Sequence, residues 1–213
     1  MIFHGYFRSS AAWRCRIAFN LKGFTPDETR YVHLRRNGGE QKEAAYRAIN
    51  PQGLVPALET DDGVLTQSLA IIEWLDETQS GPALLPQDPF LRARVRGFAQ
   101  IIACDVHPLQ NLRVLGYLGE HYGQDQAGKD EWCQRWIGEG LQASEDLVAG
   151  DTAFAFGDTP GLADICLVPQ LAAAARFGLD TAPYARLNAI AKNCNTLDAF
   201  IQAAPGKQPD FEA

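Results

Sequence analysis

The chain enters its first helix through the stretch Arg8-Ser9-Ser10-Ala11-Ala12-Trp13-Arg14-Cys15-Arg16, which follows an apolar strand and opens an apolar-periodic helix. Ser9 and Ser10 belong to the residue types that begin helices. A helix start carries unpaired backbone N–H groups and about half a positive charge, which favour an anion and lower the pKa of a nearby thiol. No cysteine opens this turn. We therefore expect the turn to bind a thiol that comes from an outside molecule.

Outward from this stretch, strand and helix patterns alternate as far as residue 78. Gly23 ends the first helix and a strand follows, so the chain opens as a β-α-β unit. Ser68 is expected to be the N-cap of the last helix in this part. In chain order, the predicted elements are strand 2–7, helix 10–22, strand 28–34, helix 40–49, strands 54–58 and 64–65, and helix 68–78.

A second domain is predicted beyond a segment of helix breakers, residues 81–89, which we interpret as the linker. Past it, apolar residues recur only at helical spacing, so this domain should be all-α. The predicted helices are 90–117, 129–148, 162–177 and 184–201. The expected domains are therefore an α/β domain at 1–80 and a helical domain at 88–213.

The charge is distributed unevenly along the chain. Residues 1–50 hold nine Lys and Arg against four Asp and Glu, whereas the remainder holds ten against twenty-two, for a formal net charge of −7. The acidic total argues against a nucleic-acid partner, and the basic first part suits a small anionic ligand. No apolar run is long enough for a membrane span and no signal-peptide pattern opens the chain, so we expect a cytoplasmic protein.

Five cysteines, at positions 15, 104, 133, 166 and 194, follow no metal-ligand spacing and no CxxC pattern. We expect all five to be buried thiols and expect no metal site. Trp132 and Trp136, four residues apart, are expected to form part of a helical core stripe.

Val55-Pro56 stands at the start of a predicted strand, where proline cannot donate to a ladder. A cis peptide resolves this conflict and leaves the main chain of Val55 open to an extended peptide, by β-strand addition. The alternative is a trans proline at a strand edge.

Five motifs in register are similar to the zeta class of glutathione S-transferases, which includes maleylacetoacetate and maleylpyruvate isomerases. The resemblance covers nearly the whole chain. It implies a glutathione S-transferase fold, with an α/β thioredoxin-like N-terminal domain and an all-α C-terminal domain, glutathione as cofactor, and a homodimer. The motifs are Phe7–Arg14, Asn50–Leu58, Gln67–Leu75, Cys104–Arg113 and Gly157–Asp164.

The resemblance also implies roles for single residues. Val55 would pair its backbone with the cysteinyl part of glutathione, and Gln67 and Ser68 would hold its γ-glutamyl carboxylate. The full set implied to bind glutathione is Gln52, Val55, Pro56, Gln67, Ser68, His107, Asn111 and Arg113, of which the last three lie near the cofactor and reach it across the dimer interface in the family. For His107, a packing role is equally open.

The implied reaction is a cis–trans isomerisation of an unsaturated dioxo diacid, with thiolate addition to the double bond, rotation and elimination. Ser9 is the main candidate for orienting the sulfur, although Ser9 and Ser10 could exchange the roles of sulfur partner and N-cap. Arg8 and Arg176 are the candidates for holding the carboxylates and the enolate charge, because a guanidinium binds a carboxylate bidentately. For Arg176, the alternative is a cation that satisfies carbonyls at a helix end. Arg14 and Arg16 lie inside the helix and are expected to be structural.

Two positions depart from the zeta pattern. Ala11 stands where the family has a cysteine, and Gly161 stands where it commonly has a capping Ser or Thr, with Asp164 expected to reach back to the Gly161 N–H. The alternatives to an isomerase are a general transferase, which conjugates or dehalogenates, and a non-catalytic protein that binds glutathione. The pair Arg8 and Arg176 favours the isomerase, and the choice between maleylacetoacetate and maleylpyruvate stays open.

Overall fold

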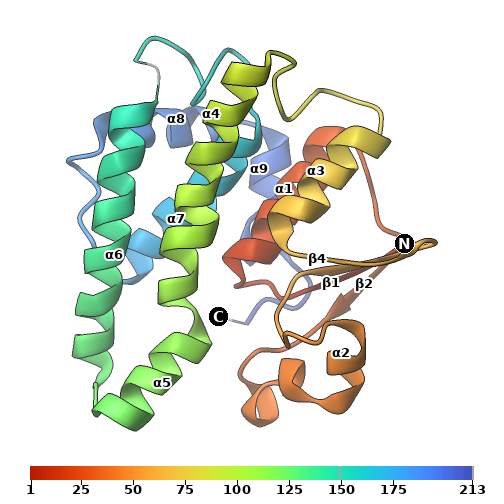
Figure 1. Cartoon of the computed structure of the whole chain (residues 1–213), viewed down its shortest axis with the longest axis vertical. Helices are drawn as coiled ribbons and strands as arrows, with labels where there is room; N and C mark the ends of the chain where they lie inside the picture. The colour runs from red at the N-terminus through yellow and green to blue at the C-terminus, as the bar shows by residue number, and fades with distance from the viewer. Residues whose placement is uncertain (149, 213) are drawn as a thin grey trace. The chain divides into compact units, whose positions relative to one another are not determined.

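The computed structural model describes residues 1–148 and 150–212 and divides into two units. Unit 1 comprises Met1–Leu84 and Thr196–Ala213, and unit 2 comprises Leu85–Asn195 (Figure 1). The expected mixed first part and helical second part are both present. The expected extent of the second domain, 88–213, needs correction, because the chain returns to unit 1 at Thr196.

Unit 1 contains a four-stranded sheet in the order β2-β1-β3-β4. Strand β2 runs parallel to β1, whereas β3 runs antiparallel to both β1 and β4. The ends of β1 and β4 and the start of β3 therefore lie side by side, where His4 pairs with Ala57 and Ala57 with Thr66. We call this row of strand ends the edge of the sheet. The strands are β1 (Ile2–Gly5), β2 (Glu28–Tyr31), β3 (Ala57–Thr60) and β4 (Gly63–Thr66).

Helices α1 (Ser10–Lys22) and α3 (Ser68–Thr78) pack against each other on one face of this sheet, and α2 (Ala44–Ile49) lies on the other (Figure 1). The predicted bounds of α1 and α3 are confirmed, and α1 ends at Gly23 in the left-handed conformation that glycine favours. The predicted helix 40–49 is shorter, because two 3₁₀ turns, Arg36–Gly38 and Glu40–Lys42, precede α2.

The C-terminal segment joins unit 1 through α9 (Asp198–Ala203), which packs along α1. Two side chains of α1 donate to its carbonyls: Arg16 Nε to Ala203 O at 2.9 Å, and Asn20 Nδ2 to Ala199 O at 2.9 Å. The predicted helix 184–201 is thus two helices, α8 (Ala185–Cys194) and α9, in different units. Its apolar spacing is helical throughout and contains no signal for this change of partner.

Unit 2 is helical, with α4 (Pro89–Gln100), α5 (Leu112–Tyr122), α6 (Gln126–Leu147), α7 (Leu162–Arg176) and α8. The first predicted helix, 90–117, is interrupted by a π-helical segment, Ile101–Val106, and a 3₁₀ turn, His107–Gln110. Pro108 explains the break, since it lacks an N–H and its ring clashes with the preceding turn of an α-helix. Close packing supports the π segment: a Cβ on Gly140 would lie 2.1 Å from Val106 Cγ2.

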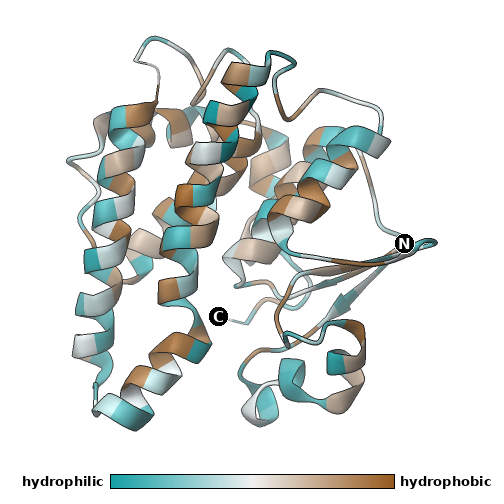
Figure 2. Cartoon of the chain, viewed as in Figure 1, coloured by the Kyte–Doolittle hydropathy of each residue, from teal (hydrophilic) through white to brown (hydrophobic). Residues whose placement is uncertain are grey.

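The core of unit 2 centres on α7, where most side chains are buried, whereas α6 alternates between hydrophilic and hydrophobic residues (Figure 2). Four of the five cysteines are buried as predicted, but Cys104 is exposed because it lies on the outward side of the π segment. Trp132 and Trp136 contact each other, with ring centroids 5.6 Å apart. Within the described residues, no helix has the length and hydrophobicity needed to cross a bilayer.

Candidate functional site

Ser9, rather than Ser10, is the N-cap of α1. Its Oγ accepts a hydrogen bond from Ala12 N at 3.2 Å, and its own N–H donates to Tyr6 O at 3.0 Å. Because the cap uses the hydroxyl as an acceptor, its proton can still be donated to an anion. Ser10 is the first helical residue and is buried, whereas Arg8 is exposed.

The segment before β3 is held by two side chains that donate to one carbonyl. Tyr46 Oη donates to Leu54 O at 2.7 Å, and Asn50 Nδ2 donates to the same oxygen at 2.6 Å. Burial raises the pKa of Tyr46 to about 12, so this phenol stays a donor at neutral pH. The carbonyl of Leu54, next to Val55, is therefore fixed from within the protein.

Val55 follows with the cis peptide to Pro56 that the sequence predicts. Its side chain is buried, and β3 begins only at Ala57. Across residues 1–148 and 150–212, no hydrogen bond involves the main-chain N–H or C=O of Val55. A buried strand end with open main-chain groups is the arrangement that accepts an added extended peptide.

The start of α3 differs from the expected one. Its N-cap is Gln67, not Ser68, and Gln67 has a φ of +69°, a strained value for a residue other than glycine. Strain of this kind tends to occur at functional sites. The Gln67 side chain donates to Gln52 Oε1 at 2.8 Å, so the structure brings these two predicted ligand-binding residues together.

Ser68 is buried beneath this turn, and its Oγ accepts from Arg14 Nε at 3.0 Å. Arg14 is 3% exposed and has no acidic partner among the residues that the structure describes. A buried cation without an anionic partner is costly unless an anion approaches it. From the sequence, Arg14 is expected to be structural, and its contact with Ser68, which ties α1 to α3, fits a structural role. The positive charge that Arg14 adds near the start of α3 was not foreseen.

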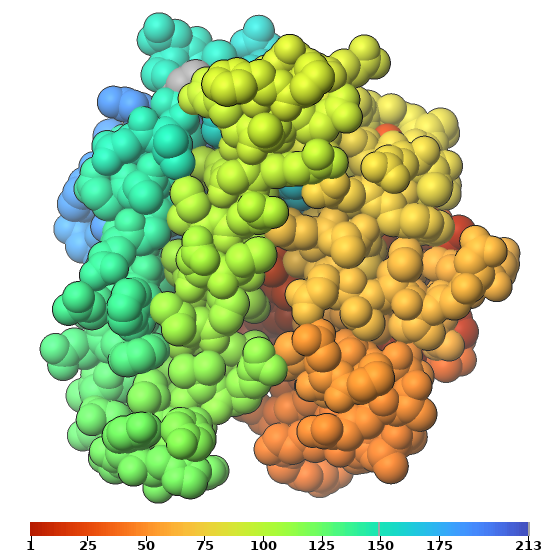
Figure 3. All heavy atoms as spheres, viewed as in Figure 1, coloured from red at the N-terminus to blue at the C-terminus, as the bar shows by residue number. Residues whose placement is uncertain are grey.

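The starts of α1, β3 and α3 lie at the same edge of the sheet, as the strand directions require. A small hydrophobic cluster beneath that edge joins the loop before α1 to Val55. In Figure 3, the atoms of α2 and of the loop after it, in orange, continue into those of α3, in gold, as one surface of unit 1. The cluster consists of Tyr6, Phe7, Val32, Tyr46 and Val55.

The other predicted site residues lie in unit 2. Asn111 is the N-cap of α5, and its Oδ1 accepts from Arg113 N at 3.1 Å. Arg176 is the last residue of α7, where its guanidinium lies 4.8 Å from the centroid of the Phe177 ring. His107 opens the 3₁₀ turn that contains Pro108. The structure therefore gives Asn111 a capping role and leaves the side chains of Arg113 and Arg176 exposed.

Asp164 closes the start of α7 as predicted. Its Oδ2 accepts from Gly161 N at 2.9 Å, and its Oδ1 accepts from Ala155 N at 2.9 Å. Burial raises the pKa of this carboxyl to about 6, against the effect of both backbone N–H groups. Asp164 serves the fold of unit 2. Within the described residues, no three His, Cys, Asp or Glu side chains are grouped as metal ligands would be.

Residues 8–78 match the family model of the glutathione S-transferase N-terminal domain. Maleylpyruvate isomerase of a Ralstonia species is 48% identical over 99% of both chains, and maleylacetoacetate isomerase of Pseudomonas aeruginosa is 47% identical over 100% of both.

Solved structures agree with these sequence relatives. A holo maleylpyruvate isomerase, a bacterial zeta-class glutathione S-transferase, has a TM-score of 0.95 at 48% identity over 100% of both chains. A maleylacetoacetate isomerase from Anaeromyxobacter dehalogenans 2CP-1 with glutathione bound in the active site has a TM-score of 0.88 at 44% identity, covering 99% of this chain and 97% of its own.

Proposed function

The chain belongs to the zeta class of glutathione S-transferases, and from this premise we propose how its residues serve a glutathione-dependent cis–trans isomerisation of maleylacetoacetate or maleylpyruvate. The protein is an enzyme, and glutathione is its cofactor. The observation that carries the residue roles is the open main chain of Val55, which lies between two helix starts without an acidic residue in their first turns.

These groups fit glutathione in charge and in length. The peptide's γ-glutamyl carboxylate matches the start of α3, where buried Arg14 adds positive charge. Strands β1 and β4 stand two strand spacings apart, or about 10 Å, which is about the length of an extended tripeptide. We assign the carboxylate to Gln67 and Ser68, the cysteinyl backbone to Val55, and the other end to Gln52.

When bound, glutathione supplies a thiol that adds reversibly to a carbon–carbon double bond and is returned unchanged. Ser9 donates a hydrogen bond from its hydroxyl to the thiolate sulfur, and the N–H groups of the first turn of α1 add their partial charge. Ala11, where the family has a cysteine, is buried and supplies packing only. Ser9 is therefore the side chain assigned to hold the sulfur ionised.

The substrate is a dioxo diacid, so both its carboxylates and the enolate oxygen need cationic partners. We assign these roles to Arg8 and Arg176, which are both exposed. His107, Asn111 and Arg113 remain candidates for contacts with glutathione in the proposed homodimer. A cytoplasmic location is likewise a proposal.

The test is conversion of maleylpyruvate and of maleylacetoacetate to their trans isomers, with and without glutathione, in wild type and Ser9→Ala. We expect isomerisation that needs glutathione but does not consume it, and a large loss in the variant. Consumption of glutathione with a standard electrophile, without isomerisation, would favour the general transferase. Glutathione binding without either reaction would favour the non-catalytic binding protein.

A further inference from the structure

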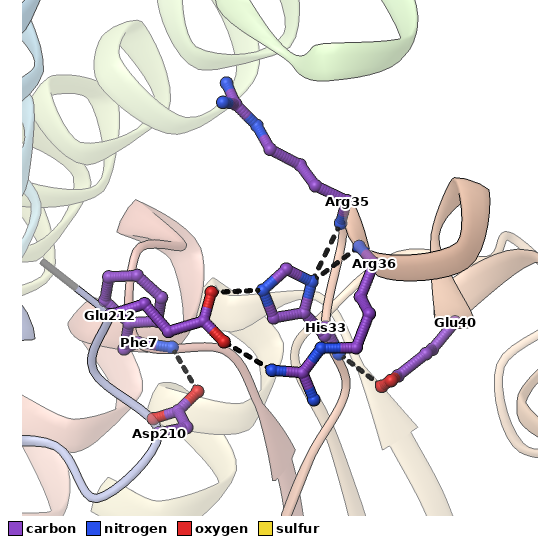
Figure 4. Close-up of polar contacts among 7 residues, drawn as sticks. All are labelled: Phe7, His33, Arg35, Arg36, Glu40, Asp210 and Glu212. Atoms are coloured by element: carbon purple, nitrogen blue, oxygen red, sulfur yellow. Dashed lines mark hydrogen bonds and ion pairs between the residues drawn. The ribbon is translucent and has the colours of Figure 1, made fainter.

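The end of the chain returns to the loop that presents Arg8 and Ser9. Asp210 Oδ2 accepts a hydrogen bond from the backbone N–H of Phe7 at 2.8 Å, although the two residues are 203 positions apart (Figure 4). The next residue, Phe211, packs its ring edge-on against Phe7, with centroids 5.4 Å apart. Phe7 itself is buried, so its N–H depends on a partner within the protein.

Arg16 holds the same loop from the helix side. Its Nη2 donates to Phe7 O at 3.0 Å and its Nη1 to Tyr6 O at 3.4 Å, while its Nε donates to Ala203 O. Burial lowers the pKa of Arg16 to about 10, and the negative charge of Asp210 opposes this shift. Arg16 therefore stays charged at neutral pH and joins the loop to the C-terminal segment.

The loop between β1 and α1 spans four residues, 6–9, and carries the two groups assigned to the chemistry. The carbonyls of Tyr6 and Phe7 accept from Arg16, and the N–H of Phe7 donates to Asp210. The Tyr6–Phe7 peptide is thus fixed at both its N–H and its C=O, and the Phe7–Arg8 peptide at its C=O. All three hydrogen bonds involve charged side chains, which bind more strongly than neutral groups do. A shift of the Phe7 main chain would therefore move both Arg8 and Ser9.

We propose that Asp210 is a positioning residue for catalysis, whose carboxylate fixes the Phe7 peptide and through it the sites of Arg8 and Ser9. The inference rests on the proposed function of Ser9. Asp210 contacts the main chain of Phe7 rather than substrate or cofactor, so its effect is on the geometry of the loop. It also gives the C-terminal segment, which sequence reasoning placed with the helical domain, a role in the active site.

A matched control lies two residues further along. Glu212 accepts from His33 Nε2 at 3.1 Å and pairs with Arg36, on the loop after β2 rather than the loop before α1 (Figure 4). His33 Nδ1 accepts backbone N–H groups, so Nε2 is the protonated nitrogen. The hydrogen bond from His33, aided by Arg36, lowers the pKa of Glu212. Glu212→Gln changes the charge of the same segment without touching Phe7.

The experiment compares Asp210→Ala, Asp210→Asn and Glu212→Gln with wild type. For each, kcat and KM for isomerisation are measured together with the pKa of the bound glutathione thiol, followed by the ultraviolet absorbance of the thiolate. We expect Asp210→Ala to lower kcat about tenfold and raise the thiol pKa by about one unit, with KM for glutathione within about twofold. Asp210→Asn keeps an acceptor oxygen and should recover most of both, and Glu212→Gln should match wild type.

The proposal is overturned if Asp210→Ala has the wild-type kcat and thiol pKa, or if Glu212→Gln loses as much as Asp210→Ala. Should Asp210→Ala not fold, Asp210→Glu displaces the acceptor while keeping the charge, and the same two changes are expected of it. The pKa of the bound thiol distinguishes failure of this proposal from failure of the proposed function. If wild type binds glutathione as a thiolate yet isomerises nothing, the function fails, while the Asp210 variants still test the positioning.

Discussion

The helices of the two units begin in different ways. At four helices of unit 2, acidic side chains satisfy backbone N–H groups at the helix start: Asp88 at α4, Asp125 at α6, Asp164 at α7, and Glu145 at α8, whereas α5 is capped by neutral Asn111. In unit 1, α1 and α3 have no acidic residue in the first turn. The positive ends of those four helices in unit 2 are therefore used by the fold, whereas the starts of α1 and α3 in unit 1 are left for a ligand.

The presence or absence of an acidic side chain at a helix start distinguishes structural helix starts from ligand-binding ones more clearly than the type of the N-cap residue does. A helix start that already holds a carboxylate repels a second anion, whereas one capped by a neutral serine or by none retains its partial charge. Arg14 strengthens the difference, because it adds a buried cation next to α3.

The largest expected effect comes from removing the neutral cap of α1. Ser9→Ala takes away the hydroxyl that donates a hydrogen bond to the thiolate, and we expect kcat for isomerisation to fall by about 10²–10³-fold. Loss of the cap itself should cost about 1 kcal/mol of unfolding free energy. Steady-state kinetics and thermal denaturation measure the two effects, with Ser10→Ala as the control that keeps the cap. An equal kcat loss in Ser10→Ala would contradict the assignment.

The internal carboxylate of α7 gives a pH dependence with a definite sign. Between the ordinary Asp pKa of 3.8 and about 6, the folded protein retains the Asp164 proton that the unfolded chain has lost. The free energy of unfolding therefore falls as pH rises through this window, by at most about 3 kcal/mol, and the loss is complete above about pH 6.

Asp164→Asn isolates this contribution, since it cannot titrate and other groups titrate equally in both proteins. Urea unfolding of the two proteins from pH 4 to pH 7 should show wild type losing stability relative to the variant. A constant difference across that range would mean that the two backbone N–H groups outweigh burial.

Much of the fold could be predicted from sequence, and the reasons are local. The bounds of α1 and α3 follow from apolar spacing together with Gly23 and the polar residues before each helix. The predictions that were wrong concern residues whose structure depends on partners far away in the sequence. Ser68 has the side chain of an N-cap but is turned inward to Arg14, and α9 has an ordinary helical period but packs on α1.

The candidate site, like the fold, could be predicted where it depends on local sequence and not where it depends on distant residues. Ser9, Val55, Gln52 and Gln67 lie at one sheet edge because local motifs and strand directions place them there. The left-handed backbone of Gln67 and the contact of Asp210 with Phe7 have no local signal, since they depend on residues far apart in the sequence. The ligand-binding roles assigned to these residues stay predictions.

Removing the buried charge of Arg14 should weaken the binding of glutathione. Arg14→Met keeps most of the side-chain volume and removes the charge near the start of α3, so we expect glutathione to bind about tenfold more weakly. Isothermal titration measures the affinity, and Arg47→Met, at an exposed position of α2, is the matched control. An unchanged affinity would place the ligand carboxylate elsewhere.

The most direct test gives a unit 1 helix the kind of start that unit 2 helices have. Ala70 is exposed at the third position of α3, where Glu and Gln can both reach back to the N-cap N–H, so both substitutions should leave thermal stability the same or higher. Only Glu adds an anion. We predict that Ala70→Glu binds glutathione about fivefold more weakly than Ala70→Gln in low salt. Equal affinities in the two variants would contradict the claim that this helix start is kept open for the ligand's carboxylate.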